Sequence, residues 1–151
     1  MRPQKKYYIA TYSAVRDRSN PDTWFYSFNT TTFLPCTDDY TLSVNLASWS
    51  SRGGWKDNAF QKTIAKPCTT VRSFFPREWR KAMVYVFNDP DRKCPFPPGT
   101  YTATNVSTQN DFTFPPSFFY GKFRGTGRVF TLAKELVGCV RFYFSIVPKH
   151  P

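Results

Sequence analysis

Apolar and polar residues alternate along much of the chain, and this period of two predicts β-strands. The clearest strand spans residues 40–46 (YTLSVNL), in which every second side chain is apolar. Such alternation is typical of a strand with one face turned inward and the other in water. Further strands, rich in aromatic and β-branched residues, are predicted at 6–14, 23–33 and 58–66.

A second alternating segment, 123–129 (FRGTGRV), differs because its apolar face includes two glycines. Gly125 and Gly127 share this face with Phe123 and Val129, while basic and polar residues occupy the other face. Glycine weakens a strand and fills no core. Two interpretations stay open: a bulge or barrel corner, or a wall kept bare so that another molecule can lie against it.

Residues 71–86 form the only predicted helix, and Pro76 suits its first position. One apolar stripe has helical spacing: Trp79, Ala82, Met83 and Val86. A stripe of this kind is usually core. The aromatic pair directly before the proline, Phe74 and Phe75, could instead line an opening.

Residues 47–55 (ASWSSRGGW) are predicted to form a loop because they combine serines with paired glycines. The loop carries two tryptophans that have few core neighbours in sequence. They either extend into a membrane or the lip of a pocket, or fold back onto the strands.

The length of 151 residues suits one domain, 1–151, with a core of its own. No apolar run approaches the roughly 18 residues of a spanning helix, and the N-terminus has no signal-peptide core. Four widely spaced cysteines favour two disulfides over zinc, and the sequons at Asn29 and Asn105 fit a secretory route. We therefore expect a secreted protein whose signal peptide has been removed. A cytosolic protein with reduced thiols is the alternative.

The formal charge of +11 and the 19% aromatic content favour one of two partners. Basic and aromatic residues together bind single-stranded nucleic acid in some proteins, and anionic membranes and lipids in others. The basic residues are dispersed here, with no long run and no RNP motif. Nucleic acid is therefore the less favoured partner.

Catalytic motifs are missing from the sequence. The single histidine, His150, lies next to the C-terminus, and the chain has no GxSxG elbow, P-loop or complete dinucleotide fingerprint. The aspartates cluster beside turn residues, where aspartate is common. We expect a non-enzymatic protein with no metal and no cofactor other than a bound lipid. The predicted fold is an all-β immunoglobulin-like β-sandwich or β-cup with an apolar inner cavity and one short helix.

Several motifs of the C-terminal third occur in a recognisable order. They are Cys94-Pro95-Phe96, Gly99-Thr100-Tyr101, Phe114-Pro115-Pro116, Tyr120-Gly121-Lys122-Phe123-Arg124 and Gly138-Cys139-Val140. In this order they resemble the ganglioside-activator-like proteins of the ML lipid-recognition group. The length, the basic charge and the NPDTWFYSF segment are more similar to the insect CheB-type chemosensory branch. The family has eight cysteines where this chain has four.

The resemblance implies a secreted carrier or presenter that holds acyl or hydrocarbon chains in a β-cup. Its context would be contact-pheromone chemosensation, with transient contact with an anionic membrane and a chemosensory channel or receptor as partner. A lysosomal sphingolipid activator that presents glycolipid to a hydrolase is one alternative. A single-stranded nucleic-acid-binding protein and an inert secreted structural domain are the others. The resemblance also suggests the disulfides Cys68–Cys94 and Cys36–Cys139.

Two sets of residues are predicted to form the lipid site. Apolar strand residues would line the cavity: Leu42, Val44, Leu46, Phe60, Phe123, Val129, Val140, Phe142, Phe144 and Ile146. Aromatic and basic residues would form its rim and contact the membrane: Trp49, Arg52, Trp55, Lys56, Phe74, Phe75, Arg77 and Trp79.

Overall fold

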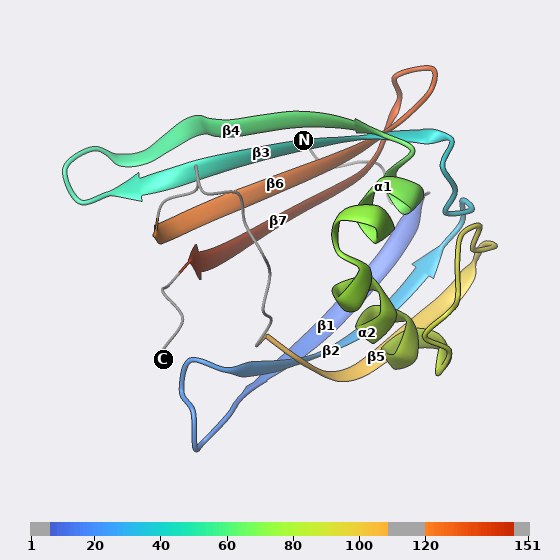
Figure 1. Ribbon diagram of the computed structural model, residues 1–151, viewed down its shortest axis with the longest axis horizontal. Helices are drawn as coiled ribbons and strands as arrows, with labels where there is room; N and C mark the ends of the chain where they lie inside the picture. The colour runs from blue at the N-terminus through green and yellow to red at the C-terminus, as the bar shows by residue number, and fades with distance from the viewer. Residues whose placement is uncertain (1–6, 109–119, 147–151) are drawn as a thin grey trace. The chain divides into compact units, whose positions relative to one another are not determined.

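The computed structural model describes residues 7–108 and 120–146, and it confirms the all-β class (Figure 1). The strands are β1 (Tyr8–Arg16), β2 (Trp24–Thr32), β3 (Tyr40–Ser50), β4 (Gly54–Ala65), β5 (Gly99–Ser107), β6 (Gly121–Thr131) and β7 (Leu136–Ile146). Two helices, α1 (Pro67–Phe74) and α2 (Pro76–Phe87), separate β4 from β5. The Phe114-Pro115-Pro116 motif and His150 lie outside the described residues.

The chain divides into two units, each assembled from segments that are distant in sequence. Among the described residues, one unit contains 39–67 and 120–146, and the other contains 7–38 and 68–108. The first unit is a four-stranded antiparallel sheet with the order β4-β3-β6-β7. The second combines a three-stranded antiparallel sheet, β1-β2-β5, with both helices.

The four-stranded sheet follows the predicted alternation closely. The segment 40–46 begins β3, which then continues to Ser50, and the segment 123–129 is the centre of β6. The β3–β6 pairing is regular from Tyr40↔Thr131 to Ser48↔Phe123. Because this register has no shift, the side chains of β3 and β6 keep the same two faces along the whole pair.

Three aromatic residues of the three-stranded sheet, Tyr12, Tyr26 and Phe28, lie on one face. Tyr12 lies opposite Phe28 in the register, and the rings of Tyr12, Tyr26 and Phe28 form a row with centroids 6.1 and 5.9 Å apart. Helix α2 contacts β5 through Phe87, whose ring meets Tyr101 edge-on at 5.6 Å. Aromatic contacts therefore attach the helical segment to this sheet.

The predicted single helix is two helices that meet at Phe75. Phe75 has a φ of −129° and a ψ of 65°, outside the helical region, and Pro76 begins α2 as predicted. The residue before a proline is sterically disfavoured in the α conformation, which explains the break. In the apolar stripe Met83 is buried and Trp79 and Val86 are half-buried, whereas Ala82 is exposed. Within the described residues, neither helix has the length and hydropathy needed to cross a membrane.

Candidate functional site

One face of the four-stranded sheet is apolar, and it carries all the residues predicted to line the cavity. In the register Leu42 lies opposite Val129, Leu46 lies opposite Phe60, and Phe123 lies opposite Phe144. The remaining members are placed on this face by the same register: Val44, Val140, Phe142 and Ile146. The register therefore places this set on one face of the sheet, and its role as the lining of a lipid cavity stays a prediction.

The exposure of this apolar face rises from the sheet centre to its edge strands. Leu46 and Phe123 are 6% and 8% exposed, but Val140 and Phe142 on the edge strand β7 are 58% and 44% exposed. On the other edge, Phe60 of β4 is 36% exposed. None of the large side chains that the structure describes is completely buried. The apolar side chains on the edge strands therefore remain partly exposed to solvent.

The two glycines of β6 are covered by side chains from the neighbouring strands. A Cβ atom on Gly125 would lie 2.4–2.9 Å from ring atoms of Phe142, and one on Gly127 would lie 3.3 Å from Val140 and 3.7 Å from Leu42. The register shows no shift at either glycine, so a bulge does not explain them. A ring placed across a strand glycine protects the backbone that the glycine exposes. The two glycines therefore leave space on β6 that the side chains of Phe142 and Val140 on β7 occupy.

The predicted tryptophan loop is the end of a β-hairpin. Trp49 and Trp55 lie opposite each other in the register, and their rings meet edge-on with centroids 5.3 Å apart. Trp55 also lies 5.8 Å from the ring of Tyr143 on β7. Because Trp49 is an odd number of residues from Leu46 on a regular strand, it belongs to the opposite face. Placement of these tryptophans on the rim of the apolar face was therefore wrong.

The other predicted rim residues do not form one cluster in either unit. Arg52 and Lys56 are exposed on the β3–β4 hairpin, whereas Phe74, Phe75, Arg77 and Trp79 belong to the helical segment of the second unit. Trp79 donates its indole N–H to the carbonyl of Arg92 at 3.0 Å and stacks on Phe96. That contact assigns Trp79 to local packing rather than to a rim.

The face opposite the apolar one has a polar concavity of about 370 Å³. It is lined by Asn45, Ala47, Asp57, Asn58, Arg124, Thr126, Arg128 and Arg141. Asp57 and Asn58 are consecutive, so a regular strand would point them to opposite faces. The register between β3 and β4 shifts here, and Asn58 has a left-handed φ of 62°. This bulge turns both side chains into the concavity.

Three arginines surround one buried threonine in the concavity. Arg124 and Arg128 flank Thr126 along β6, two residues away on each side, and Arg141 lies opposite Thr126 on β7. Thr126 is 6% exposed and accepts a hydrogen bond from Nε of Arg141 at 3.4 Å. Asp57 contacts Arg124 at 2.6 Å, and the Arg124 guanidinium lies 5.2 Å from the centre of the Trp55 ring.

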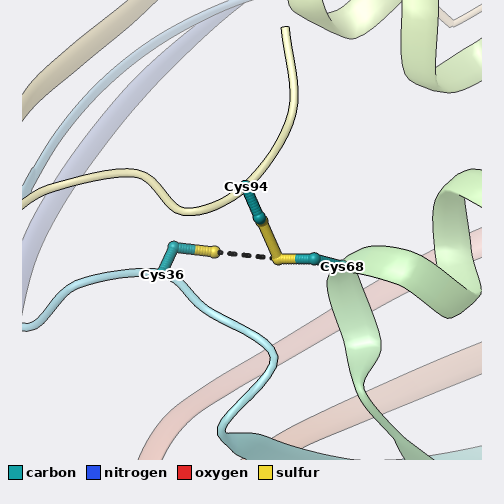
Figure 2. A group of neighbouring side chains, drawn as sticks. All are labelled: Cys36, Cys68 and Cys94. Carbon is teal, nitrogen blue, oxygen red and sulfur yellow. Dashed lines mark hydrogen bonds between the residues drawn. A yellow bond between two sulfur atoms is a disulfide. The ribbon is translucent and has the colours of Figure 1, made fainter.

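A third group of interest is a cluster of cysteines in the second unit (Figure 2). Cys68 and Cys94 form a disulfide, as predicted, and the sulfur of Cys36 lies 3.8 Å from that of Cys68. Cys36 is held there by two backbone hydrogen bonds exchanged with Phe96, each 2.9 Å long. The bridge spans a sequence separation of 26 residues. A loop of this length corresponds to about 3.5 kcal/mol of stabilisation in the loop-closure model.

The predicted disulfide Cys36–Cys139 does not form. Cys36 and Cys139 both keep their thiols, and Cys139 lies on β7 opposite Arg128, in the other unit. Desolvation and, second, the negative charge of Asp38 raise the pKa of Cys36 above its ordinary value. The thiol therefore stays protonated at neutral pH, where it is a poor nucleophile toward the adjacent disulfide.

Both predicted glycosylation residues are exposed. Asn29 lies on β2, and Asn105 lies on β5 with a left-handed φ of 54°. The amide N–H of Asn105 donates to Ser27 Oγ at 3.1 Å, so its side chain remains outside this contact. Their glycosylation stays a prediction.

No protein-family model matches this chain, and a search of curated proteins finds no significant match. The resemblance to the ganglioside-activator-like group therefore stays a prediction. Sequence reasoning did not identify the arginine concavity. The alternation of β6 placed Arg124, Thr126 and Arg128 on one face, but only the register shows that Arg141 joins them.

Proposed function

We propose that the protein binds a hydrocarbon or acyl chain on the apolar face of its four-stranded sheet. The observation that carries this proposal is the shared apolar face, whose edge residues Val140 and Phe142 remain 58% and 44% exposed. Burial of such surface against a ligand is favourable at about 25 cal/mol per Å². A surface of this chemistry gains from apolar contact and offers few side-chain hydrogen bonds.

The composition of the face supports a chain-like ligand. Gly125 and Gly127 are filled by Phe142 and Val140, which leaves a surface of methyl groups and aromatic rings across β6 and β7. Each methylene buried there would contribute at most about 0.8 kcal/mol, a factor of about four in affinity. Affinity should therefore increase with chain length.

The position of Lys62 supports the idea that the ligand has an acidic head group. It lies opposite Val44 in the β3–β4 register, so it projects from the apolar face at the β4 edge. A chain lying across the sheet would bring a carboxylate or phosphate toward this ammonium group. Notably, Lys62 was not among the residues predicted for the site.

A carrier or presenter outside the cell is the role that we favour for this binding. The Cys68–Cys94 disulfide is typical of an oxidising compartment, and the exposed Asn29 and Asn105 suit a secretory route. The resemblance to the ML lipid-recognition group supports presentation of the lipid to a chemosensory channel or receptor. It supports presentation of a glycolipid to a hydrolase as the alternative.

Native mass spectrometry of purified protein, before and after organic extraction, tests the proposal. We expect a co-purified lipid or, after delipidation, uptake of an offered fatty acid at near-equal stoichiometry. Val140→Glu puts a charge on the most exposed position that β7 contributes to the apolar face, and it should reduce uptake by about ten-fold or more. Ser145→Glu, on the opposite face of the same strand, is the matched control and should bind normally.

Two results would contradict the proposal. One is a lipid-free mass with no uptake of fatty acids of any length. The other is equal uptake by Val140→Glu and Ser145→Glu, provided that far-ultraviolet circular dichroism shows both variants folded. Either result would mean that the apolar face does not contact a ligand.

A further inference from the structure

Strand β1 forms one edge of the three-stranded sheet, whose order is β1-β2-β5. Just beyond the two ends of β1, the Tyr7 carbonyl and the Asp17 N–H each make a 2.9 Å backbone hydrogen bond to the segment that carries β2. Hydrogen-bonded pairs alternate with non-hydrogen-bonded pairs in an antiparallel ladder, so the odd-numbered residues of β1 bond to β2. The backbone N–H and C=O groups of Ala10, Tyr12 and Ala14 therefore point away from β2, along the outer edge of the sheet.

Among the edge strands of the two described sheets, β1 lacks the features that usually keep an edge from pairing. Charged side chains and β-bulges are such features. Strand β4 has two lysines and an aspartate, and β7 has an arginine. Strand β5 is uncharged, but its register with β2 shifts and Asn105 has a left-handed φ. In contrast, β1 has no charge from Tyr8 to Val15 and pairs with β2 without a shift.

The sequence of β1 is nearly a palindrome about Tyr12, and this symmetry indicates which partner fits the edge. Mirror positions hold similar residues: Ile9 and Val15, Ala10 and Ala14, and Thr11 and Ser13. In a two-fold symmetric pair, residue i of one copy meets residue j of the other, and j meets i. A palindromic strand therefore meets its own copy with similar residues at every pair, which an unrelated partner would not require.

We propose that β1 pairs antiparallel with β1 of a second copy of this chain, with the two-fold axis at Tyr12. In this register the outward-pointing residues become hydrogen-bonded pairs, because Tyr12 meets its own counterpart and Ala10 meets the partner's Ala14. The two three-stranded sheets then join into one continuous sheet. The interface goes beyond the proposed function, since it uses the other sheet and needs no ligand.

This pairing covers apolar side chains that are exposed on β1. Ile9 and Val15 are 55% and 64% exposed on one face, and Tyr12 is 72% exposed on the other. Ile9 would contact the partner's Val15, and the two tyrosine rings would meet across the axis; such cross-strand pairs stabilise a sheet. The single charged residue of β1, Arg16, lies opposite the partner's Tyr8 in this register. A chain with a net charge of +11 can thus associate here without opposing like charges on the paired strands.

Sedimentation velocity of the full chain over a range of concentrations tests the interface. We expect a reversible equilibrium in which the larger species has twice the 17.6 kDa mass of the chain. Tyr12→Lys places two like charges opposite each other and removes an aromatic pair, so it should weaken dimerisation by about ten-fold. Thr102→Lys adds the same charge at an exposed position of β5, the other edge of this sheet, and should leave dimerisation unchanged.

Cysteines introduced on β1 test the register. The Cα atoms of a hydrogen-bonded antiparallel pair are about 5.5 Å apart, within the range that a disulfide bridges. A mixture of Ala10→Cys and Ala14→Cys should therefore form a covalent dimer on mild oxidation. Either variant alone should form little, because equivalent positions of the two copies lie about 14 Å apart. Wild-type protein, which retains the Cys36 and Cys139 thiols, gives the background.

Several outcomes would overturn the proposal. They are a monomer at every concentration, equal dimerisation of Tyr12→Lys and Thr102→Lys, and equal cross-linking of Ala10→Cys alone and of the mixture. Growth beyond the dimer would also overturn it, because a two-fold pair occupies the β1 edge of both copies. The cysteine variants keep small side chains on β1, so they test the interface even if circular dichroism shows that Tyr12→Lys does not fold.

Discussion

The two faces of the four-stranded sheet are formed by the same strands, but only one of them has an open concavity. On the apolar face, Gly125 and Gly127 remove side chains, and Phe142 and Val140 fill the space. The opposite face, called the arginine face here, carries Arg124, Arg128 and Arg141. On this face a bulge at Asn58 adds polar side chains around the concavity. Side chains of β7 therefore fill the space over the glycines on the apolar face, whereas the arginine face has an open concavity lined by charged residues.

The difference shows that a binding surface cannot be inferred from small residues alone. Glycine in a strand suggests open space, but Gly125 lies beneath an aromatic ring. The open concavity instead surrounds Thr126, a residue that gives no such signal in the sequence. Cross-strand neighbours, set by the register, decide which positions stay accessible.

The largest expected effect comes from placing the same negative charge on the two faces of β3. Leu46 is 6% exposed on the apolar face, so Leu46→Asp should lower the free energy of unfolding by about 4 kcal/mol. Ser43 lies opposite Arg128 on the other face, so Ser43→Asp should be neutral or add up to about 1 kcal/mol. Urea denaturation of both variants measures the difference.

Ser43→Asn is the control for side-chain size in this experiment. It adds almost the same volume as Ser43→Asp without the charge, so any gain from Arg128 should be absent. Similar losses in Leu46→Asp and Ser43→Asp would mean that the two faces are not electrostatically distinct. The comparison between them would then fail.

Much of the first unit could be predicted because strand alternation is a local property. The segments 40–46 and 123–129 are strands, and the apolar residues drawn from them share one face. The hairpin at 47–55 could not be predicted in this way. Its serines and glycines favour a loop, but the Trp49–Trp55 pair and the contact of Trp55 with Arg124 stabilise strand pairing instead.

Features that depend on long-range pairing were missed for a physical reason. The concavity requires the β6–β7 register, which places Arg141 opposite Thr126. The position of Cys36 beside Cys68 requires its backbone pairing with Phe96, which is far away in the sequence. Neither pairing produces a periodic signal within a single segment. The break at Phe75, by contrast, could have been predicted from the following proline.

A smaller effect is expected from closing the glycine gap on the apolar face. In Gly125→Ala the new methyl group would meet the Phe142 ring at 2.4 Å and force it outward, at a cost of about 1–2 kcal/mol. Gly53→Ala is the matched control, because no atom lies within 4 Å of the added group. In Gly125→Ala/Phe142→Ala the clash is gone, so the double variant should be more stable than additivity predicts, by about 1 kcal/mol. Thermal unfolding of the wild-type protein, Gly125→Ala, Phe142→Ala and the double variant gives this coupling energy. Strict additivity of the two single changes would show that the Phe142 ring does not cover Gly125.

The smallest effect is expected on the arginine face, where solvent screens the charges. The Arg124–Asp57 pair is exposed at Asp57, so Asp57→Ala should cost no more than about 0.5 kcal/mol and less at high salt. Arg124→Met keeps most of the stem but removes both the ion pair and the stacking on Trp55, for a loss of about 1 kcal/mol. The stacking part should persist in about 1 M salt, because the guanidinium lies against a ring rather than across water. If high salt removed the whole effect of Arg124→Met, Trp55 would contribute nothing to holding this arginine, and the ion pair alone would position it.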